Sequence, residues 1–226
     1  MTTMMGAAVN EFVPAAPVSE RQQRPRTTGG VPVPAGPSAP LLVGRLLEAN
    51  RVLAQLIGEL HHQARHDPLT GLPNRRHLLE RIDAAIAAAG EDDIGLCFAD
   101  LDHFKEVNDR FGHGTGDQVL AVVADRLRDS VRGSDCMIAR IGGDEFVALI
   151  PPPADDARIR TIANLLLTAL AEPIVVAGHP LRLSASIGAV LTAVAGAHAE
   201  ALLDAADTGL YEAKSTGKGR WILSIR

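Results

Sequence analysis

The chain has 226 residues, of which 46% are hydrophobic and 3% aromatic, and its formal net charge at pH 7 is −5. This length suits one substantial domain with an accessory segment, and the core must consist mainly of aliphatic side chains. The negative charge argues against binding a nucleic-acid polymer through a basic surface, so an anionic ligand needs a local group of cations and metal. Two cysteines, no apolar run near the ~20 residues that cross a bilayer and no secretory signal predict a cytoplasmic protein without a membrane span.

Residues 1–40 are rich in proline, with small and polar residues between the prolines. Such a segment buries too little apolar surface to offset the entropy lost on ordering, so we expect a disordered tail. A helical pattern follows at 41–66, where apolar residues recur with 4-3-4-3-4 spacing at Leu42, Leu46, Ala49, Leu53, Leu56 and Leu60. This spacing predicts either the seam of a short coiled coil or an amphipathic helix packed on its own domain, and spacing alone does not separate the two.

Residues 67–226 alternate between helical and strand patterns. Helices are predicted at about 75–89, 116–131, 155–171 and 200–215, and strands at 94–99, 136–141, 146–150, 174–177, 181–192 and 221–225. The run Gly142-Gly143-Asp144-Glu145 between two of these strands is a hairpin signal. The pattern predicts an α+β domain in which helices cover a mostly antiparallel sheet.

Two acidic groups carry the first chemical signal. Asp144 and Glu145 follow two glycines, which permit positive φ and let a ligand approach the backbone closely. Taken alone, this run is a tight turn with solvated acids. Asp100 and Asp102 end the strand predicted at 94–99, however, and the two groups can converge on one point. Clustered carboxylates repel unless a divalent cation neutralises them, and hard oxygen ligands suit Mg²⁺ or Mn²⁺ with substrate phosphates. The pattern indicates metal-assisted phosphoryl or nucleotidyl transfer.

Five segments, in order, resemble the GGDEF family of diguanylate cyclases, and the resemblance covers residues 67–226. The segments are Asp67–Arg76, Asp100–Asp109 with its continuation through Gly112-His113 to Gly116-Asp117, Arg140–Phe146, Ser186–Gly188 and Tyr211–Lys218. The resemblance implies a palm-like nucleotide cyclase fold. It also implies an enzyme that condenses two GTP molecules into cyclic di-GMP and two pyrophosphates.

The resemblance also assigns roles to residues. The metal ligands that it implies are Asp100, the Leu101 carbonyl, Asp144 and Glu145. Of these, Asp144 or, less favoured, Glu145 is the general base. The other residues that it places at the substrate are Phe104, Lys105, Asn108, His113, Asp117, Gly142, Gly143, Lys214 and Lys218. Asn108 and Asp117 read the guanine edge, since a carboxylate accepts two N–H bonds from guanine. The three lysines meet the triphosphate as point charges, and at position 218 the family more often has arginine.

Two members of this set have simpler readings, because Phe104 also fits a core aromatic and His113 a loop or helix-capping histidine.

Dimerisation follows from the implied reaction. Each domain holds one GTP, so two domains must face each other, and this favours the coiled-coil interpretation of residues 42–60. No sensor domain fits in residues 1–40, so a regulatory partner would act through residues 1–66. The alternative function is a catalytically silent receptor for GTP or cyclic di-GMP, but the chain retains the acidic and guanine-reading residues that such receptors lose.

One departure concerns feedback inhibition. The family's inhibitory product site is an Arg-x-x-Asp placed five residues before the paired glycines. Arg132 and Asp135 have the right spacing from each other, but six residues separate Asp135 from Gly142. A one-residue shift turns side chains to the other face of a strand unless a bulge absorbs it. Two readings stay open: a site for cyclic di-GMP, or a surface turn with a local ion pair.

Overall fold

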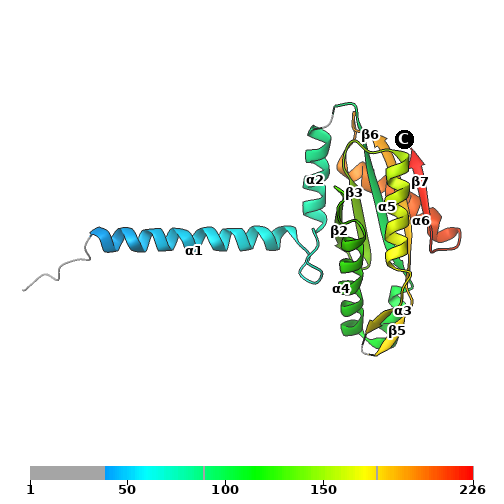
Figure 1. Ribbon diagram of the computed structural model, residues 1–226, viewed down its shortest axis with the longest axis horizontal. Helices are drawn as coiled ribbons and strands as arrows, with labels where there is room; N and C mark the ends of the chain where they lie inside the picture. Colours follow the sequence, from blue (N-terminus) through cyan, green and yellow to red (C-terminus); the bar gives the residue numbers. More distant parts are fainter. Residues whose placement is uncertain (1–38, 89, 177, 226) are drawn as a thin grey trace, which may run out of the picture. The chain divides into compact units, whose positions relative to one another are not determined.

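The computed structural model describes residues 39–88, 90–176 and 178–225 (Figure 1). Its elements in chain order are α1 Ala39–Arg65, α2 Arg75–Ala88, β1 Asp93–Asp102, α3 Phe104–Phe111, α4 His113–Ser130, β2 Met137–Gly142, β3 Glu145–Ile150, α5 Asp156–Ala169, β4 Ile174–Val176, β5 His179–Leu181, β6 Ser184–Ala193, α6 Ala199–Ser215 and β7 Trp221–Ile225. None of the helices in these ranges is long and apolar enough to cross a bilayer.

Five strands form the main sheet in the order β2-β3-β1-β6-β7. Every neighbouring pair is antiparallel except β6 and β7, which run parallel. The strands β4 and β5 form a separate two-stranded ribbon. The prediction of an α+β domain with a mostly antiparallel sheet is confirmed.

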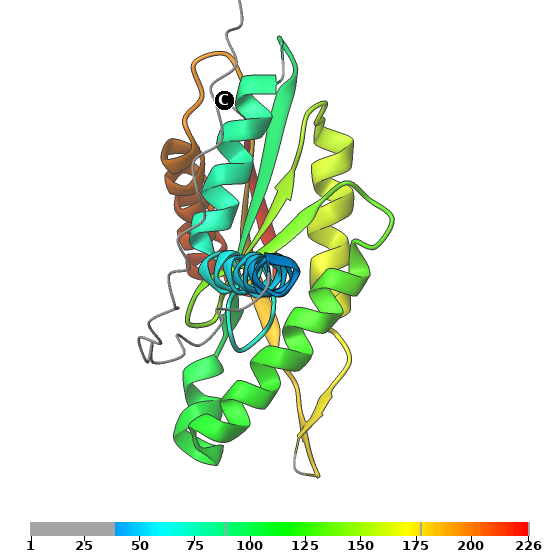
Figure 2. The ribbon, with the colours of Figure 1, turned by 90° about the vertical axis from the view of Figure 1, so that its left-hand side faces the viewer.

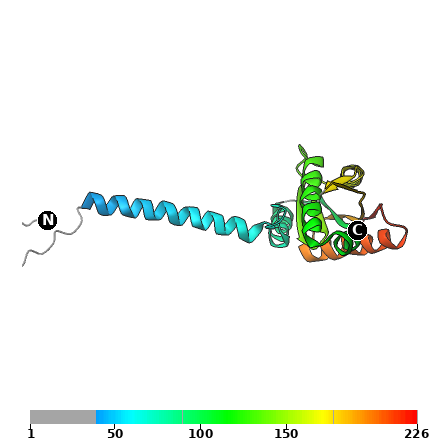
Figure 3. The same cartoon turned by 90° about the horizontal axis from the view of Figure 1, so that it is seen from below.

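Helices cover both faces of the sheet, with α2 and α6 on one side and α4 and α5 on the other (Figure 2, and from below in Figure 3). Alternation along the central strand β1 explains the two layers, because successive side chains of a strand point to opposite faces. Ile94, Leu96 and Phe98 lie in the core with α2 and α6. Cys97 and Ala99 point to the opposite face and lie in the core with α4 and α5.

Several element boundaries differ from the prediction. The strand predicted at 94–99 continues to Asp102, because Asp100 pairs with Glu145 in β3 and Asp102 pairs with Ser184 in β6. The strand predicted at 181–192 is divided between β5 and β6. The short helix α3 was not predicted, although its buried Phe104 and Val107 have the i, i+3 spacing of a helix face.

The predicted disordered tail falls on residues 1–40, of which residues 1–38 lie outside the described residues. Ala39 and Pro40 begin α1, and the first turn of a helix tolerates proline because its N–H has no intrahelical partner there. In α1 the predicted seam is solvent-exposed: its leucines at 42, 46, 53, 56 and 60 are each at least 50% exposed. The division at residues 40 and 66 stays a prediction.

Candidate active site

The pairing of β1 with β3 brings the two acidic segments together. Asp100 lies directly opposite Glu145 in the antiparallel register. The Leu101 N–H donates to the Asp144 carbonyl at 3.3 Å, and Gly143, with φ of 42°, forms the tight turn between β2 and β3. A turn with positive φ suits glycine, which has no Cβ to clash. The backbone therefore sets three carboxylates around the end of β1.

The electrostatics of these acids are those of a crowded anionic site. Burial raises the pKa of Asp100, and the nearby charge of Asp144 raises it further, while Lys214 opposes the rise from 2.8 Å away. Burial also raises the pKa of Glu145, with added repulsion from Asp100, Asp144 and Asp207. Both carboxylates are thus destabilised in their charged forms, and a cation nearby would relieve that cost.

A cavity of about 440 Å³ opens beside the end of β1. The residues of the predicted site that line it are Asp100, Leu101, Phe104, Lys105, Asp144, Lys214 and Lys218. Two of the predicted carboxylates therefore share one cavity with three lysines, and Asp102, Glu106 and Asp109 line it as well. Acidic groups and lysines together suit a metal-bound polyphosphate. Glu145 instead lines a neighbouring hollow with Asp204 and Asp207.

The two predicted guanine-reading residues lie on α3 and α4. A Cβ added at Gly116 would overlap Oδ1 of Asn108, so the Asn108 amide lies against the first turns of α4, one residue from Asp117 in sequence. Phe104 is 7% exposed and packs beside the same glycine, which fits its reading as a core aromatic. Neither Asn108 nor Asp117 lines the 440 Å³ cavity. His113 is exposed at the start of α4.

The second acid of the strand end, Asp102, has a structural environment. It is 3% exposed and accepts hydrogen bonds from Ser184 Oγ and Ser186 Oγ, each at 2.7 Å, and from the Gly219 N–H at 3.0 Å. Three donors satisfy the buried carboxylate, as a buried charge requires. Ser186 belongs to one of the segments that resemble the family, and its hydrogen bond to Asp102 gives a physical role to that serine.

Arg140 holds the turn between β2 and β3 in place. Its guanidinium donates two hydrogen bonds to the Gly143 carbonyl, at 3.0 and 2.8 Å, and one to Asp67 Oδ1 at 2.8 Å. Asp67 also accepts from the N–H and the hydroxyl of Thr70. The first segment of the family resemblance therefore holds the Gly-Gly-Asp-Glu turn in place through one arginine, a role that sequence reasoning missed.

This ion pair makes a testable contribution to stability. Burial alone would raise the pKa of Asp67, but hydrogen bonds from Thr70 and Arg140 outweigh it, and the net shift is below the ordinary 3.8. A carboxyl with a lowered pKa in the folded state stabilises the fold above 3.8, and the contribution is lost as the pH falls through the folded-state pKa. We expect Asp67→Asn to lower the melting temperature at pH 7. As the pH falls from 3.8 through the folded-state pKa of Asp67, the variant should lose less stability than the parent.

Thermal melts between about pH 2.5 and pH 7 would measure this difference, because one group's protonation sets the difference in slope. Arg140→Met removes the other partner and should change the curve in the same sense. Parallel stability curves for the parent and Asp67→Asn would contradict the assignment.

Arg132 and Asp135 lie in the turn after α4. Arg132 Nη2 is 2.7 Å from Asp129 Oδ1, and the Arg132 side chain is 77% exposed. The pairing of β2 with β3 shifts register between Arg140 and Gly142, so the strand that leads from this turn to the hairpin carries an irregularity. A ligand that binds Arg132 has to compete with Asp129, and inhibition by cyclic di-GMP through Arg132 and Asp135 stays a prediction.

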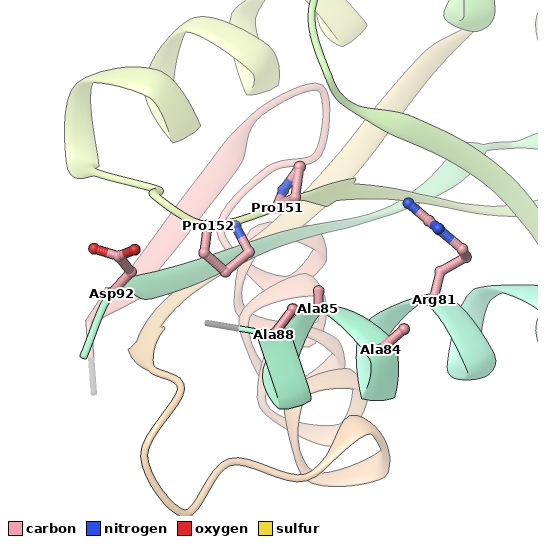
Figure 4. A pocket seen from close by; sticks show the side chains of 7 residues that line it. All are labelled: Arg81, Ala84, Ala85, Ala88, Asp92, Pro151 and Pro152. Carbon is pink, nitrogen blue, oxygen red and sulfur yellow. The ribbon is translucent and has the colours of Figure 1, made fainter. Parts of the chain in front are cut away.

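A further hollow, of about 350 Å³, lies between α2 and the segment that follows β3 (Figure 4). Ala84, Ala85 and Ala88 of α2 and two prolines form its walls, with Arg81 and Asp92 on opposite sides of the view. None of the predicted site residues lines it. The chemistry indicated by the sequence is concentrated at the end of β1 instead.

Comparison with known proteins agrees with this geometry. Residues 64–220 match the family model described as "Diguanylate cyclase, GGDEF domain". The match covers more than half of the chain, and the chain belongs to the GGDEF family.

Three relatives illustrate the similarity. The bifunctional diguanylate cyclase/cyclic di-GMP phosphodiesterase MucR of Pseudomonas aeruginosa is 44% identical over 79% of this chain and 25% of its own length. The diguanylate cyclase DgcP of the same species is 43% identical over 68% of this chain and 23% of its own length. The crystal structure of the coiled coil and GGDEF domain of DgcB from Caulobacter crescentus, in complex with c-di-GMP, superposes with a TM-score of 0.70 at 27% identity and covers 82% of this chain and 99% of that one. The chain thus spans about a quarter of the length of MucR and DgcP.

Proposed function

We propose that the chain is a diguanylate cyclase, which joins two GTP molecules into cyclic di-GMP and releases two pyrophosphates. The observation that carries this proposal is the single cavity in which Asp100 and Asp144 face three lysines. The names of the relatives in the same family support it. In each half-reaction a 3′-hydroxyl oxygen bonds to the α-phosphorus of the other GTP, the bond to pyrophosphate breaks, and the hydroxyl proton leaves.

The donor set at the cavity fits a divalent cation of the hard class, Mg²⁺ or Mn²⁺. Oxygen ligands are available at the cavity from Asp100, the Leu101 carbonyl and Asp144, and Glu145 lies opposite Asp100 in the strand register. Burial raises the pKa values of Asp100 and Glu145, and repulsion from the neighbouring carboxylates adds to the rise. Within residues 39–88, 90–176 and 178–225, no three His, Cys, Asp or Glu side chains are already grouped as metal ligands. When bound, the ion lowers the pKa of the attacking hydroxyl and neutralises charge at the phosphate.

The chain's own residues would bind and orient the substrate. Lys105, Lys214 and Lys218 supply positive charge for the triphosphate, while Gly142 and Gly143 leave the hairpin backbone open to close approach. Asn108 and Asp117 would hold the guanine from α3 and α4, and His113 would help to shape that pocket. Asp144, or less favoured Glu145, would accept the proton of the 3′-hydroxyl on a carboxylate oxygen.

The direct test is incubation of the purified protein with GTP and Mg²⁺, followed by chromatographic separation of the nucleotides. Formation of cyclic di-GMP together with twice its amount of pyrophosphate is the expected result. Saturable binding of GTP or cyclic di-GMP without either product would instead place the chain among the receptors.

We also place the reaction in the cytoplasm, which suits the free thiols of Cys97 and Cys136.

Two copies of the chain are needed for this reaction, and we propose that residues 42–60 join them as a parallel coiled coil. The leucines of the seam are exposed to solvent in the part of the chain that the structure describes, and pairing two such helices would bury them. Joining the domains raises the effective concentration of one GTP site for the other. A regulatory partner would act through residues 1–66, where it could change the pairing.

A single charge in the seam tests the dimer. Leu53→Glu is expected to convert the dimer into a monomer and to lower turnover by about tenfold or more at micromolar protein, because two domains then meet only by diffusion. Gln55→Glu introduces the same side chain off the predicted seam and should leave both properties unchanged. Light scattering after gel filtration gives the mass. A Leu53→Glu protein that remains dimeric would exclude this seam.

A further inference from the structure

Two non-glycine residues in the described ranges have positive φ, and they face each other. They are His103, with φ of 64°, and Lys218, with φ of 60°. Their side chains come within 3.4 Å, measured from Lys218 Nζ to His103 Nε2. Both residues line the 440 Å³ cavity. Left-handed backbone is uncommon outside glycine and persists where the surrounding structure imposes it, often at functional sites.

The two ring nitrogens of His103 contact different groups, because Nε2 is 3.4 Å from Lys218 Nζ and Nδ1 is 2.6 Å from Glu106 Oε1. A lysine ammonium only donates, so Nε2 of His103 must be the acceptor. The proton of the neutral ring then sits on Nδ1, which donates to Glu106 Oε1 at 2.6 Å. Glu106 thereby selects the tautomer that turns a lone pair toward the lysine. The three side chains form a chain from carboxylate through imidazole to ammonium.

The backbone around Lys218 is held by the residue next to His103. The N–H of Gly219 donates to Asp102 Oδ2 at 3.0 Å, and the N–H of Lys218 donates to the Ala213 carbonyl at 3.1 Å. Asp102 is itself buried. Two adjacent residues at the end of β1 thus hold the same turn. Asp102 binds the backbone N–H of Gly219, and His103 contacts the side chain of Lys218.

We propose that His103 is a positioning residue, which holds the Lys218 ammonium at the cavity where the triphosphate binds. Lysine is a point charge on a flexible stem, so a second contact reduces the freedom it loses when a phosphate arrives. The inference deepens the proposed function, on which it rests for the identity of the substrate.

The test uses 3′-deoxy-GTP with Mg²⁺, which lacks the attacking hydroxyl, so its dissociation constant is measured without turnover. His103→Asn removes the reach to Lys218 but keeps a residue that tolerates left-handed backbone. We expect it to weaken binding about fivefold, the scale of one hydrogen bond. With GTP, the KM should rise by a similar factor while kcat stays within about twofold, because the contact acts on binding.

A double-variant cycle separates positioning from a merely structural role. Lys218→Met should weaken binding more than His103→Asn, and the double variant should bind as Lys218→Met does, because His103 acts through Lys218. Additive effects, or an unchanged dissociation constant in His103→Asn, would overturn the proposal. If the parent binds 3′-deoxy-GTP in this pattern but makes no cyclic di-GMP from GTP, the proposed cyclase activity fails and the positioning role stands.

Discussion

Asp144→Ala is expected to lower the formation of cyclic di-GMP from GTP by about a thousandfold, equivalent to ~4 kcal/mol in the activation barrier. Asp144 lines the cavity beside Asp100, and its charge adds to the effect of burial in raising the pKa of that carboxyl. Its removal takes away the proposed cation ligand and the proposed base together. The fold should survive, because the contact that Asp144 makes with Leu101 uses the backbone carbonyl, which alanine retains.

The measurement is the initial rate of pyrophosphate release at saturating Mg²⁺, with thermal melts and gel filtration to show that the variant folds and associates as the parent does. Asp92→Ala is the matched control, since it removes a carboxylate from the hollow in Figure 4, which no predicted site residue lines. A catalytic metal stabilises the transition state by several kcal/mol, so loss of one of its ligands should lower the rate by much more than tenfold. An Asp144→Ala protein that keeps a tenth or more of the parent rate would therefore show that the carboxylate of Asp144 is dispensable.

The fold class could be predicted because it depends on local patterns. Apolar runs with strand and helix periods mark most elements, and Asn74, a residue type that favours the N-cap, directly precedes α2. Its side-chain oxygen does accept the N–H of His77. The hairpin was visible because paired glycines beside two acids are a local signal.

The environment of each acid could not be predicted, because its partners are distant in sequence. Asp100 and Asp102 looked equivalent as neighbours at a strand end. The structure gives Asp102 hydrogen bonds from residues 82, 84 and 117 positions away, and it places Asp100 beside Lys214. The contact between His103 and Lys218 spans 115 positions. Such pairings arise only once β1, β6 and the turn after α6 are assembled.

Gly188→Ala is expected to destabilise the domain by at least about 3 kcal/mol, because overpacking against backbone leaves no flexible group to yield. Gly188 lies in β6, where the sheet meets α6. A Cβ at this position would overlap the carbonyl oxygen of Ala206 and the nitrogen of Leu210, and would lie 2.7 Å from the carbonyl carbon of Gly209. The first two groups are four residues apart in α6, the spacing of a helical hydrogen bond. The methyl group would therefore press the helix away from the sheet.

Gly209→Ala is the matched comparison from the other side of the same contact. Its Cβ would lie 3.2 Å from the Gly188 Cα, a tight but smaller overlap, and alanine favours a helix over glycine by ~1 kcal/mol. Urea unfolding should place Gly209→Ala well above Gly188→Ala in stability. Equal stability would mean that α6 can move off β6 at little cost. That matters for the site, because Lys214 lies on α6 and reaches Asp100 only while the helix is packed on the sheet. Gly188 thus affects the reaction through packing, and a partly folded Gly188→Ala protein should bind 3′-deoxy-GTP more weakly than its folded fraction predicts.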